Sequence, residues 1–286
     1  NSLLLEVFRK KSETISAAHL LRNYQLNRYV KPADLPVLDL KETELNILKL
    51  FKSLSFEPIE LSPVTILGSC SVVAPADQNK ILTALRGTEV LADSTNAMAL
   101  HVCYLKKLKG FKETVSDKLR FGAIQRHIRT QPLMSKGFTS HFKVGCLVTS
   151  GVDGGNFTFE KESILEHIIL MKSIFENFYK VDNLSFRLLC RDGYADSFRL
   201  ATDVKEYASA NVAGTELEII EDPGNKITYY KGIQYKVDIR WKDRMFEIGD
   251  GGFVDWTQQI LQNKKERFLI GGFGFELIYR IVNGMI

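Results

Sequence analysis

Two runs of alternating apolar residues, separated by a long polar loop, constrain the fold of this chain more than any other feature. The runs cover residues 119–128 and 142–149, and the loop covers residues 129–141. Alternation with a period of two is typical of β-strands. The loop contains Pro132 and Gly137, which favour turns. The sequence therefore predicts two strands of one sheet, joined by this loop.

Other periodic segments predict helices around that sheet. Apolar residues recur at helical spacing over residues 41–55, 94–108, 163–179 and 255–263. Further β-like runs occupy residues 56–61, 184–189, 216–220, 229–241 and 245–248. Glycines in residues 249–252 predict a turn, and residues 267–281 predict a strand that passes into a helix. This pattern predicts an α+β fold, with a largely antiparallel sheet flanked by helices.

The clearest helix covers residues 163–179. Ser163 and Glu166 have the spacing of a capping box, S-x-x-E, which favours a helix start at Ser163. A stripe of apolar residues on one side of this helix is typical of a core-facing surface. It consists of Ile164, Leu165, Ile168, Met171, Phe175 and Phe178.

Length and composition favour one large domain. The chain has 286 residues, of which 45% are hydrophobic, and this is enough for a sizeable core. Residues 1–40 are of mixed character and are interpreted as an N-terminal arm, and residues 41–286 as the core domain. The net charge of +4 permits a nucleic-acid partner but does not argue for one.

Several classes of function lack support in this sequence. The four cysteines are widely spaced without a C-x-x-C pair, so we predict buried thiols and no metal site. No apolar run reaches the roughly 20 residues of a membrane helix, and the N-terminus lacks the charge order of a signal peptide. A cytoplasmic protein without a membrane partner is therefore expected. The motifs of zinc proteases, serine hydrolases and P-loop proteins are absent.

Two segments resemble motifs of the class II aminoacyl-tRNA synthetases, and in particular of the histidyl type. The helix at residues 41–55 followed by FEPIELSP is similar to motif 1, which ends in a proline, here Pro63. The segment RFGAIQRHIRTQPLMSKGFTSHFKVGCLVTSG is similar to motif 2. The resemblance implies the class II fold, and a homodimer formed through motif 1.

The resemblance also implies an ATP site. Arg126 matches the motif 2 arginine that grips the α-phosphate, because a guanidinium offers fixed, permanently charged donors. Arg129 and His141 lie in or beside the loop that would contact the nucleotide. The segment ERFLIGGFGFELIYRI resembles motif 3, in which small residues allow the backbone to approach ATP and a helix carries an arginine. The corresponding residues are Gly272, Gly274 and Arg280.

An amino-acid pocket follows from the same resemblance. LADSTNAMALHV places Asp93 where the family binds a substrate ammonium group, with Thr95 beside it, although both residues also suit a plain helix N-cap. ITYYKGIQYKV and FEIGDGGFVDW resemble the tyrosine-pair and glycine-pair segments of the histidyl type. The implied pocket residues are Asp93, Thr95, Lys143, Tyr229, Tyr230, Gly251 and Gly252.

Three departures from the family pattern concern the chemistry. Ile128 replaces the glutamate of motif 2, and Phe253 replaces the arginine after the glycine pair. Asn225 stands near the position of an arginine that stabilises charge on the α-phosphate, with Lys226 as the nearest cation. Lysine lacks the planar fork of arginine, and removing such a charge stabiliser costs orders of magnitude in rate. We therefore assign no catalytic residue.

These observations favour a histidyl-type paralogue that has kept the fold and lost or changed the reaction. The expected absence of an anticodon-binding domain after motif 3 favours the same interpretation. The first hypothesis is a non-catalytic subunit that senses an amino acid or nucleotide beside a catalytic partner protein, as in the regulatory subunit of ATP phosphoribosyltransferase, which serves histidine biosynthesis. The second is an enzyme that activates an amino acid or another small acid with ATP and Mg²⁺ through an acyl-adenylate. A module that binds RNA or tRNA ranks last, because the basic excess is small.

Overall fold

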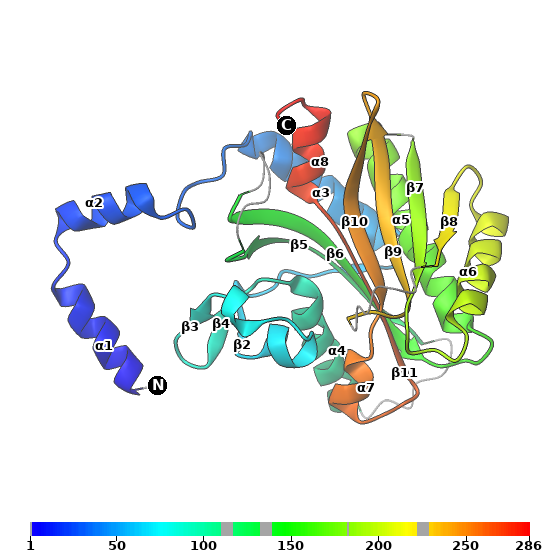
Figure 1. The fold of residues 1–286 in the computed structure, drawn as a ribbon, viewed down its shortest axis with the longest axis horizontal. Coiled ribbons are helices and arrows are strands. Elements are labelled where there is room, and N and C mark those ends of the chain that lie inside the picture. Colours follow the sequence, from blue (N-terminus) through cyan, green and yellow to red (C-terminus); the bar gives the residue numbers. More distant parts are fainter. Residues whose placement is uncertain (1, 110–116, 132–138, 182, 222–228) are drawn as a thin grey trace.

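An eight-stranded sheet forms the centre of the molecule (Figure 1). The computed structural model describes residues 2–109, 117–131, 139–181, 183–221 and 229–286. In spatial order, the strands are β1 (Glu57–Pro58), β5 (Leu119–Ile128), β6 (His141–Val152), β11 (Glu266–Phe273), β10 (Arg244–Phe253), β9 (Lys231–Trp241), β7 (Leu184–Cys190) and β8 (Glu216–Ile220). A second, three-stranded sheet consists of β2 (Val64–Ile66), β4 (Thr88–Val90) and β3 (Thr83–Ala84).

Most neighbours in the large sheet are antiparallel, as predicted. The predicted strand–loop–strand unit is confirmed: β5 and β6 pair antiparallel from Leu119 opposite Ser150 to Ile128 opposite His141. Residues 132–138 of the predicted loop lie outside the described residues. The two parallel pairs, β1 with β5 and β7 with β8, lie at the two edges of the sheet. Pro58 lies in the edge strand β1, where a missing backbone N–H is tolerated.

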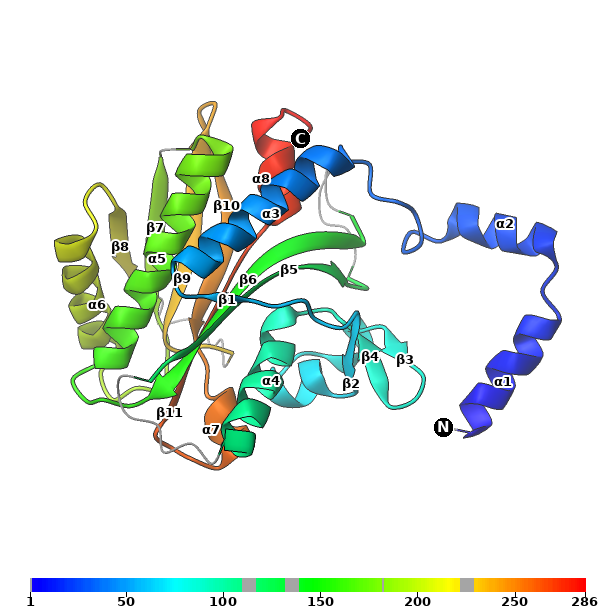
Figure 2. The ribbon, with the colours of Figure 1, turned by 180° about the vertical axis from the view of Figure 1, so that it is seen from behind.

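Helices cover both faces of the large sheet, which is the α+β layout predicted (Figure 2). The helices are α1 (Ser2–Glu13), α2 (Ala17–Leu26), α3 (Val37–Ser53), α4 (Ser94–Lys109), α5 (Thr158–Tyr179), α6 (Ser197–Asn211), α7 (Trp256–Leu261) and α8 (Phe275–Val282), with short turns at Ser69–Val73 and Gln78–Lys80. The larger core lies between the sheet and α3, α5, α6 and α8, and the smaller core lies beneath α4 and α7. Successive strand residues alternate between the two cores: Leu269 packs in the larger one, and Phe268 and Ile270 in the smaller one.

The predicted core stripe of α5 is confirmed, but its predicted start is wrong. Ile164, Ile168, Met171 and Phe175 are buried in the larger core. The helix begins at Thr158, so Ser163 lies inside it, fully buried, and caps nothing. The residues before α5, Asn156 and Phe157, have left-handed backbone conformations that turn the chain into the helix. Glu166 pairs with Arg120 instead of closing a capping box.

The chain also differs from the prediction after residue 184. Strand β10 continues through residues 249–252, where the glycines predicted a turn. Helix α6 lies between the predicted strands 184–189 and 216–220, where no element was predicted. Asp196 caps it by accepting a hydrogen bond from the backbone N–H of Arg199 at 2.8 Å. Its buried face consists of Leu200, Ala201, Val204 and Ala208. Because β9 begins at Lys231, the tyrosine pair precedes the strand.

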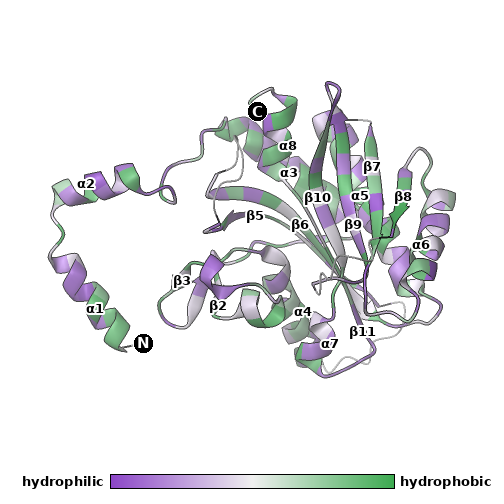
Figure 3. Ribbon diagram, in the orientation of Figure 1, coloured by the Kyte–Doolittle hydropathy of each residue, from purple (hydrophilic) through white to green (hydrophobic). Residues whose placement is uncertain are grey.

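The first two helices extend away from the rest of the molecule, and α3 begins at Val37 (Figure 1). Hydrophilic and hydrophobic residues alternate along α1 and α2 (Figure 3). Helix α2 has no buried residue. Of the helices that the structure describes, none combines the length and the apolar character needed to cross a membrane.

Candidate functional site

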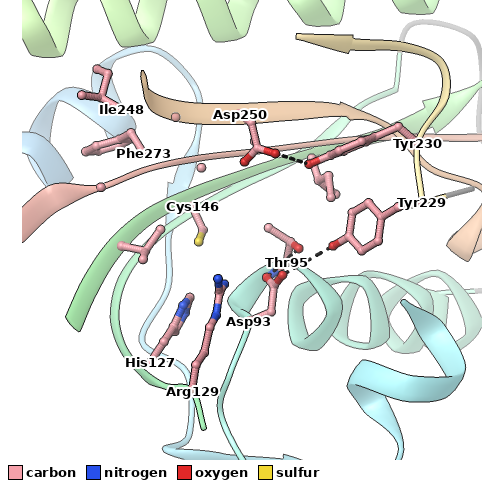
Figure 4. A pocket seen from close by; sticks show the side chains of 16 residues that line it. Asp93, Thr95, His127, Arg129, Cys146, Tyr229, Tyr230, Ile248, Asp250 and Phe273 are labelled. Atoms are coloured by element: carbon pink, nitrogen blue, oxygen red, sulfur yellow. Dashed lines mark hydrogen bonds between the residues drawn. The ribbon is translucent and has the colours of Figure 1, made fainter. Parts of the chain in front are cut away.

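Two adjoining cavities open on the face of the sheet that α4 covers. Their volumes are about 170 and 370 Å³. The residues common to both linings are Asp93, Arg129, Tyr229, Tyr230 and Asp250 (Figure 4). These side chains come from the start of α4, the end of β5, the segment before β9, and β10. We refer to the two cavities together as the central site.

Asp93 is held in place at the N-terminus of α4. Its Oδ1 accepts hydrogen bonds from the backbone N–H and the hydroxyl of Thr95, both at 2.8 Å. Its Oδ2 accepts a longer bond of 3.5 Å from the hydroxyl of Tyr229 (Figure 4). Asp93 therefore has both of the roles considered for it: one carboxylate oxygen caps helix α4, and the other faces the cavity. The structure brings together four residues predicted for the amino-acid pocket: Asp93, Thr95, Tyr229 and Tyr230.

Asp250 supplies a second carboxylate, which the sequence analysis did not identify. It accepts hydrogen bonds from the hydroxyl of Tyr230 at 3.0 Å and from Nε2 of Gln234 at 3.5 Å. Its side chain is exposed to solvent and lines both cavities. Burial raises the pKa of Asp250, and the charge of Asp93 raises it further, against the hydrogen bond from Tyr230. Asp250 was missed because residues 249–252 were interpreted as a turn. In a strand, the alternation of side chains places Asp250 on the side of the cavity.

Arg129 is the cation at the centre of the site. Its Nε donates to the backbone oxygen of Ala92 at 3.0 Å, and its guanidinium lies 5.4 Å from the centre of the Phe142 ring. It also lines a third cavity of about 180 Å³, together with Lys143, Gly274 and Arg280. Arg129 thus joins the central site to the region predicted to hold a nucleotide.

His127 points into the central site from β5 (Figure 4). Its side chain is fully buried, and Nε2 lies 2.7 Å from Oγ of Ser94. Its Nδ1 has no hydrogen-bond partner in the described part of the chain. Burial lowers the pKa of His127 to about 4, so the ring is neutral at physiological pH. The sequence could have indicated His127 as a site residue. It stands two positions before Arg129, and alternate residues of a strand lie on the same face.

Arg126 lies on the opposite side of β5 from these residues. Its Nη2 pairs with the Glu276 carboxylate of α8, and Nη1 lies 2.9 Å from Nδ1 of His141. Nε2 of His141 lies 2.5 Å from the backbone oxygen of Lys31. Neither Arg126 nor His141 lines the central site or the third cavity. The structure therefore does not bring the predicted phosphate-binding arginine together with Asp93.

The remaining predicted residues divide between the cavities. Lys143 forms an ion pair of 2.5 Å with Glu44 and lines the third cavity, away from the tyrosine pair. Arg280 lines the same cavity and donates from Nη2 to the backbone oxygen of Asp34 at 3.3 Å. Gly274 reaches both the third cavity and the central site. Whether these groups bind ATP stays a prediction.

Glycines form the backbone floor of the central site. Gly272 lines it, and a Cβ added there would meet no atom closer than 3.5 Å. Gly251 faces the core instead, where a Cβ would lie 2.4 Å from the hydroxyl of Tyr235. A Cβ on Gly252 would lie 2.5 Å from the backbone oxygen of Ile233. The predicted glycine pair therefore allows close packing of β10, and neither member lines the central site.

The departures from the family pattern also have structural positions. Phe253 is buried in the larger core, where its ring centre lies 6.3 Å from those of Phe159 and Tyr194. It faces away from the central site. Asn225 and Lys226 lie outside the described residues. Among the residues that are described, no group of three His, Cys, Asp or Glu side chains could hold a metal ion.

The charges of the central site do not fit a triphosphate. ATP carries charges that proteins neutralise with several cations, as arginines, lysines and Mg²⁺. In the described lining, Arg129 and the exposed Lys80 face the carboxylates of Asp93 and Asp250. These charges cancel, so this lining offers no excess of cations for three phosphates.

Comparison with known proteins supports the fold prediction. No family model and no curated protein matches the chain. Among solved structures, an ATP phosphoribosyltransferase regulatory subunit/histidyl-tRNA synthetase from Bacillus halodurans is 12% identical, with a TM-score of 0.66 over 90% of this chain and 83% of that one. The apo histidyl-tRNA synthetase of S. aureus is also 12% identical, with a TM-score of 0.64 over 88% and 68% of the chains.

A histidine–tRNA ligase subunit from Alicyclobacillus acidocaldarius is 10% identical, with a TM-score of 0.60 over 89% of this chain and 98% of that one. The predicted class II synthetase-like fold, an antiparallel sheet flanked by helices, is therefore confirmed. The similarity to proteins of the histidyl type is one of fold, because the sequence identities are low.

Proposed function

We propose that this chain is a non-catalytic, synthetase-like subunit that binds an amino acid in the central site. One observation carries this proposal: Asp93 and Arg129, fixed by their own hydrogen bonds, line the same cavities as the tyrosine pair. A carboxylate and a guanidinium in one cavity complement the ammonium and carboxylate groups of a zwitterion. Because both side chains are already held in place, little side-chain entropy is lost on binding.

Three features argue against adenylate formation. Arg126 is paired with Glu276 on the other side of β5, so it would have to change partner to reach a phosphate beside Asp93. Phe253 lies in the core and offers no charge. The described lining of the central site has no excess of cations. Catalysis by charge stabilisation needs such groups in place before the reaction.

The proposal includes a protein partner and a homodimer. The likeness in fold to a phosphoribosyltransferase regulatory subunit supports a catalytic partner, whose activity the bound amino acid would regulate. Helix α3, which occupies the position of motif 1, exposes the large apolar side chains of Val37, Leu38 and Leu45. Exposed apolar surface of this kind is typical of an interface, and a two-fold dimer is the commonest oligomer.

Calorimetry with a panel of the standard amino acids tests the function. We expect one or a few amino acids to bind with a dissociation constant in the micromolar range, about −8 kcal/mol. Asp93→Asn should weaken binding at least tenfold, because asparagine keeps the helix cap but removes the charge that faces the ammonium group. Glu218→Gln, on the exposed side of β8, removes one charge far from the site and should leave binding unchanged.

A parallel assay separates this proposal from the activating-enzyme hypothesis. The same amino acids are tested for pyrophosphate exchange with ATP and Mg²⁺. Amino-acid-dependent exchange would overturn the non-catalytic proposal. Binding without exchange would support it. If neither the standard amino acids nor ornithine binds, the central site is not an amino-acid sensor and the proposal is wrong.

A further inference from the structure

The smaller cavity of the central site has more negative than positive charge. The charged residues of its lining are Asp93, Asp250 and Arg129, which give two negative charges against one positive charge. His127 is neutral, and burial keeps the pKa of Tyr229 and Tyr230 well above the ordinary value. Lys80 lines only the larger cavity. A zwitterion with a neutral side chain adds no net charge, so within the smaller cavity one carboxylate would stay without a counter-charge.

Asp250 is that carboxylate. It accepts hydrogen bonds only from neutral groups, Tyr230 and Gln234, among the described residues. No cation in the described ranges lies within ion-pair distance of it. Its neighbour Lys236 is bound to Glu247 at 2.8 Å. A carboxylate that lines a cavity and has no cationic partner attracts positive charge, so a ligand cation at this position would be favoured.

His127 adds a second, independent acceptor to the same cavity. Nε2 of His127 lies 2.7 Å from Oγ of Ser94, and the tautomer of the ring decides which of the two atoms donates. In the tautomer that carries its proton on Nε2, that N–H donates to the Ser94 oxygen, and Nδ1 is left as an acceptor. This Nδ1 is fully buried and unpartnered in the described structure. Leaving such a group unpaired is unfavourable, so a ligand that brings a donor to it would be favoured.

We infer that the central site selects an amino acid with a second cationic group, such as lysine or ornithine, and that Asp250 is the residue that determines this specificity. The inference rests on the proposed function, since it assigns the α-ammonium group to Asp93 and the carboxylate group to Arg129. The side-chain ammonium is assigned to Asp250. An ammonium group has three N–H donors, which suit the carboxylate oxygens of Asp250, and Nδ1 of His127 is a further acceptor in the lining of the same cavity.

Asp250 is not among the residues on which the resemblance to the family rests. The glycine-pair segment reads FEIGDGGFVDW, and the acid stands before the two glycines. Its side chain reaches the cavity because β10 continues through this segment, with Asp250 opposite Gly272 of β11. Gly272 has no side chain, so nothing on β11 at this register blocks the carboxylate from the cavity.

Matched pairs of amino acids test the inference on the full chain. Lysine is compared with norleucine, and ornithine with norvaline, by calorimetry at neutral pH. Each pair is alike in its aliphatic chain but differs in the terminal ammonium group. We expect at least one diamino acid to bind ten or more times as tightly as its neutral counterpart. Equal affinities within both pairs would overturn the inference while leaving the proposed function intact.

Asp250→Asn should reduce the lysine-to-norleucine ratio to about one and leave the affinity for norleucine within about twofold. Glu218→Gln is the matched control, because it removes one carboxylate from the exposed side of β8, outside the lining of the site. It should preserve the ratio. An Asp250→Asn protein that keeps the full ratio would overturn the role of Asp250. If this variant does not fold, the wild-type ratio still decides whether a second cation is selected.

Binding of the diamine cadaverine distinguishes a failure of the proposed amino-acid function from a failure of the inference about a second cation. Cadaverine has two ammonium groups and no carboxylate. If it binds while no amino acid does, two cations are recognised but the proposed amino-acid function is wrong. If norleucine binds as tightly as lysine and cadaverine does not bind, an amino acid is recognised but the inference about its second cation is wrong.

Discussion

Two adjacent glycines of β11 allow a test of the register that builds the central site. Gly271 faces the larger core, where an added Cβ would lie 2.0 Å from the hydroxyl of Tyr235 and 2.9 Å from Nδ1 of His167. Gly272 faces the central site, and its Cβ would meet no atom closer than 3.5 Å. The same substitution, glycine to alanine, should therefore destabilise the fold at one position and obstruct the ligand at the other.

The cost of Gly271→Ala follows from its surroundings. Inserting a methyl group into a packed core costs about 1–3 kcal/mol. Moving Tyr235 also breaks its 3.0 Å hydrogen bond to His167, which adds about 1 kcal/mol. The free energy of unfolding should fall by about 2–4 kcal/mol in total. For a chain of this length, the melting temperature should fall by roughly 5–15 °C.

Gly272→Ala should change the melting temperature by less than about 2 °C, because a residue in extended backbone with free space accepts a methyl group. It should weaken amino-acid binding at least tenfold, since the methyl group enters the cavity. Thermal denaturation measures the first effect for both variants, and calorimetry the second. If Gly272→Ala is as destabilising as Gly271→Ala, or if Gly271→Ala is neutral, the assignment of the two faces of β11 is wrong.

Two further predictions concern the larger core. Phe253→Ala should lower the free energy of unfolding by about 3–5 kcal/mol, as large-to-small core substitutions of phenylalanine do. Phe253→Arg should lower it further, because it buries a charge away from the site. If urea denaturation shows that Phe253→Arg is stable, the placement of Phe253 in the core is wrong. Burial lowers the pKa of His167 to about 3, from an ordinary value of 6.5. Below pH 6.5 the unfolded chain binds a proton that the folded chain excludes, so stability should fall by up to about 1.4 kcal/mol per pH unit between pH 6.5 and 4. Urea denaturation of His167→Gln should show a shallower decline, so that the two proteins converge at low pH, and parallel curves would contradict the burial of a neutral His167.

The fold could be predicted largely from sequence, because its strands and helices follow the periodicity of their apolar residues. The β5–β6 pair, α4 and the core stripe of α5 lie where that periodicity indicates. The start of α5 could not be found in this way. Ser163 has the residue type and spacing of a cap, but tertiary packing extends the helix past it and buries it. Local propensity yields to packing at such positions.

The candidate site was predictable only in part. The positions around Asp93 and the tyrosine pair could be predicted because they follow a family pattern. Asp250 could not, since glycines next to it predicted a turn, whereas in the sheet these glycines allow close approach of β10 and β11. The face of β5 on which Arg126 lies could not be predicted either. A shift of one residue along a strand moves a side chain to the other face of the sheet, and a motif match does not fix this register.

The floor of the central site consists of backbone, whereas its selectivity lies in side chains from separate parts of the chain. Asp93, Arg129 and Asp250 can each be exchanged without disturbing the glycines on which a ligand would rest. Because the floor is backbone and the selective groups are side chains, a change of ligand requires only single substitutions in the lining. The sheet itself can stay the same. Proteins that share this floor can therefore diverge in what they recognise while their folds stay superimposable.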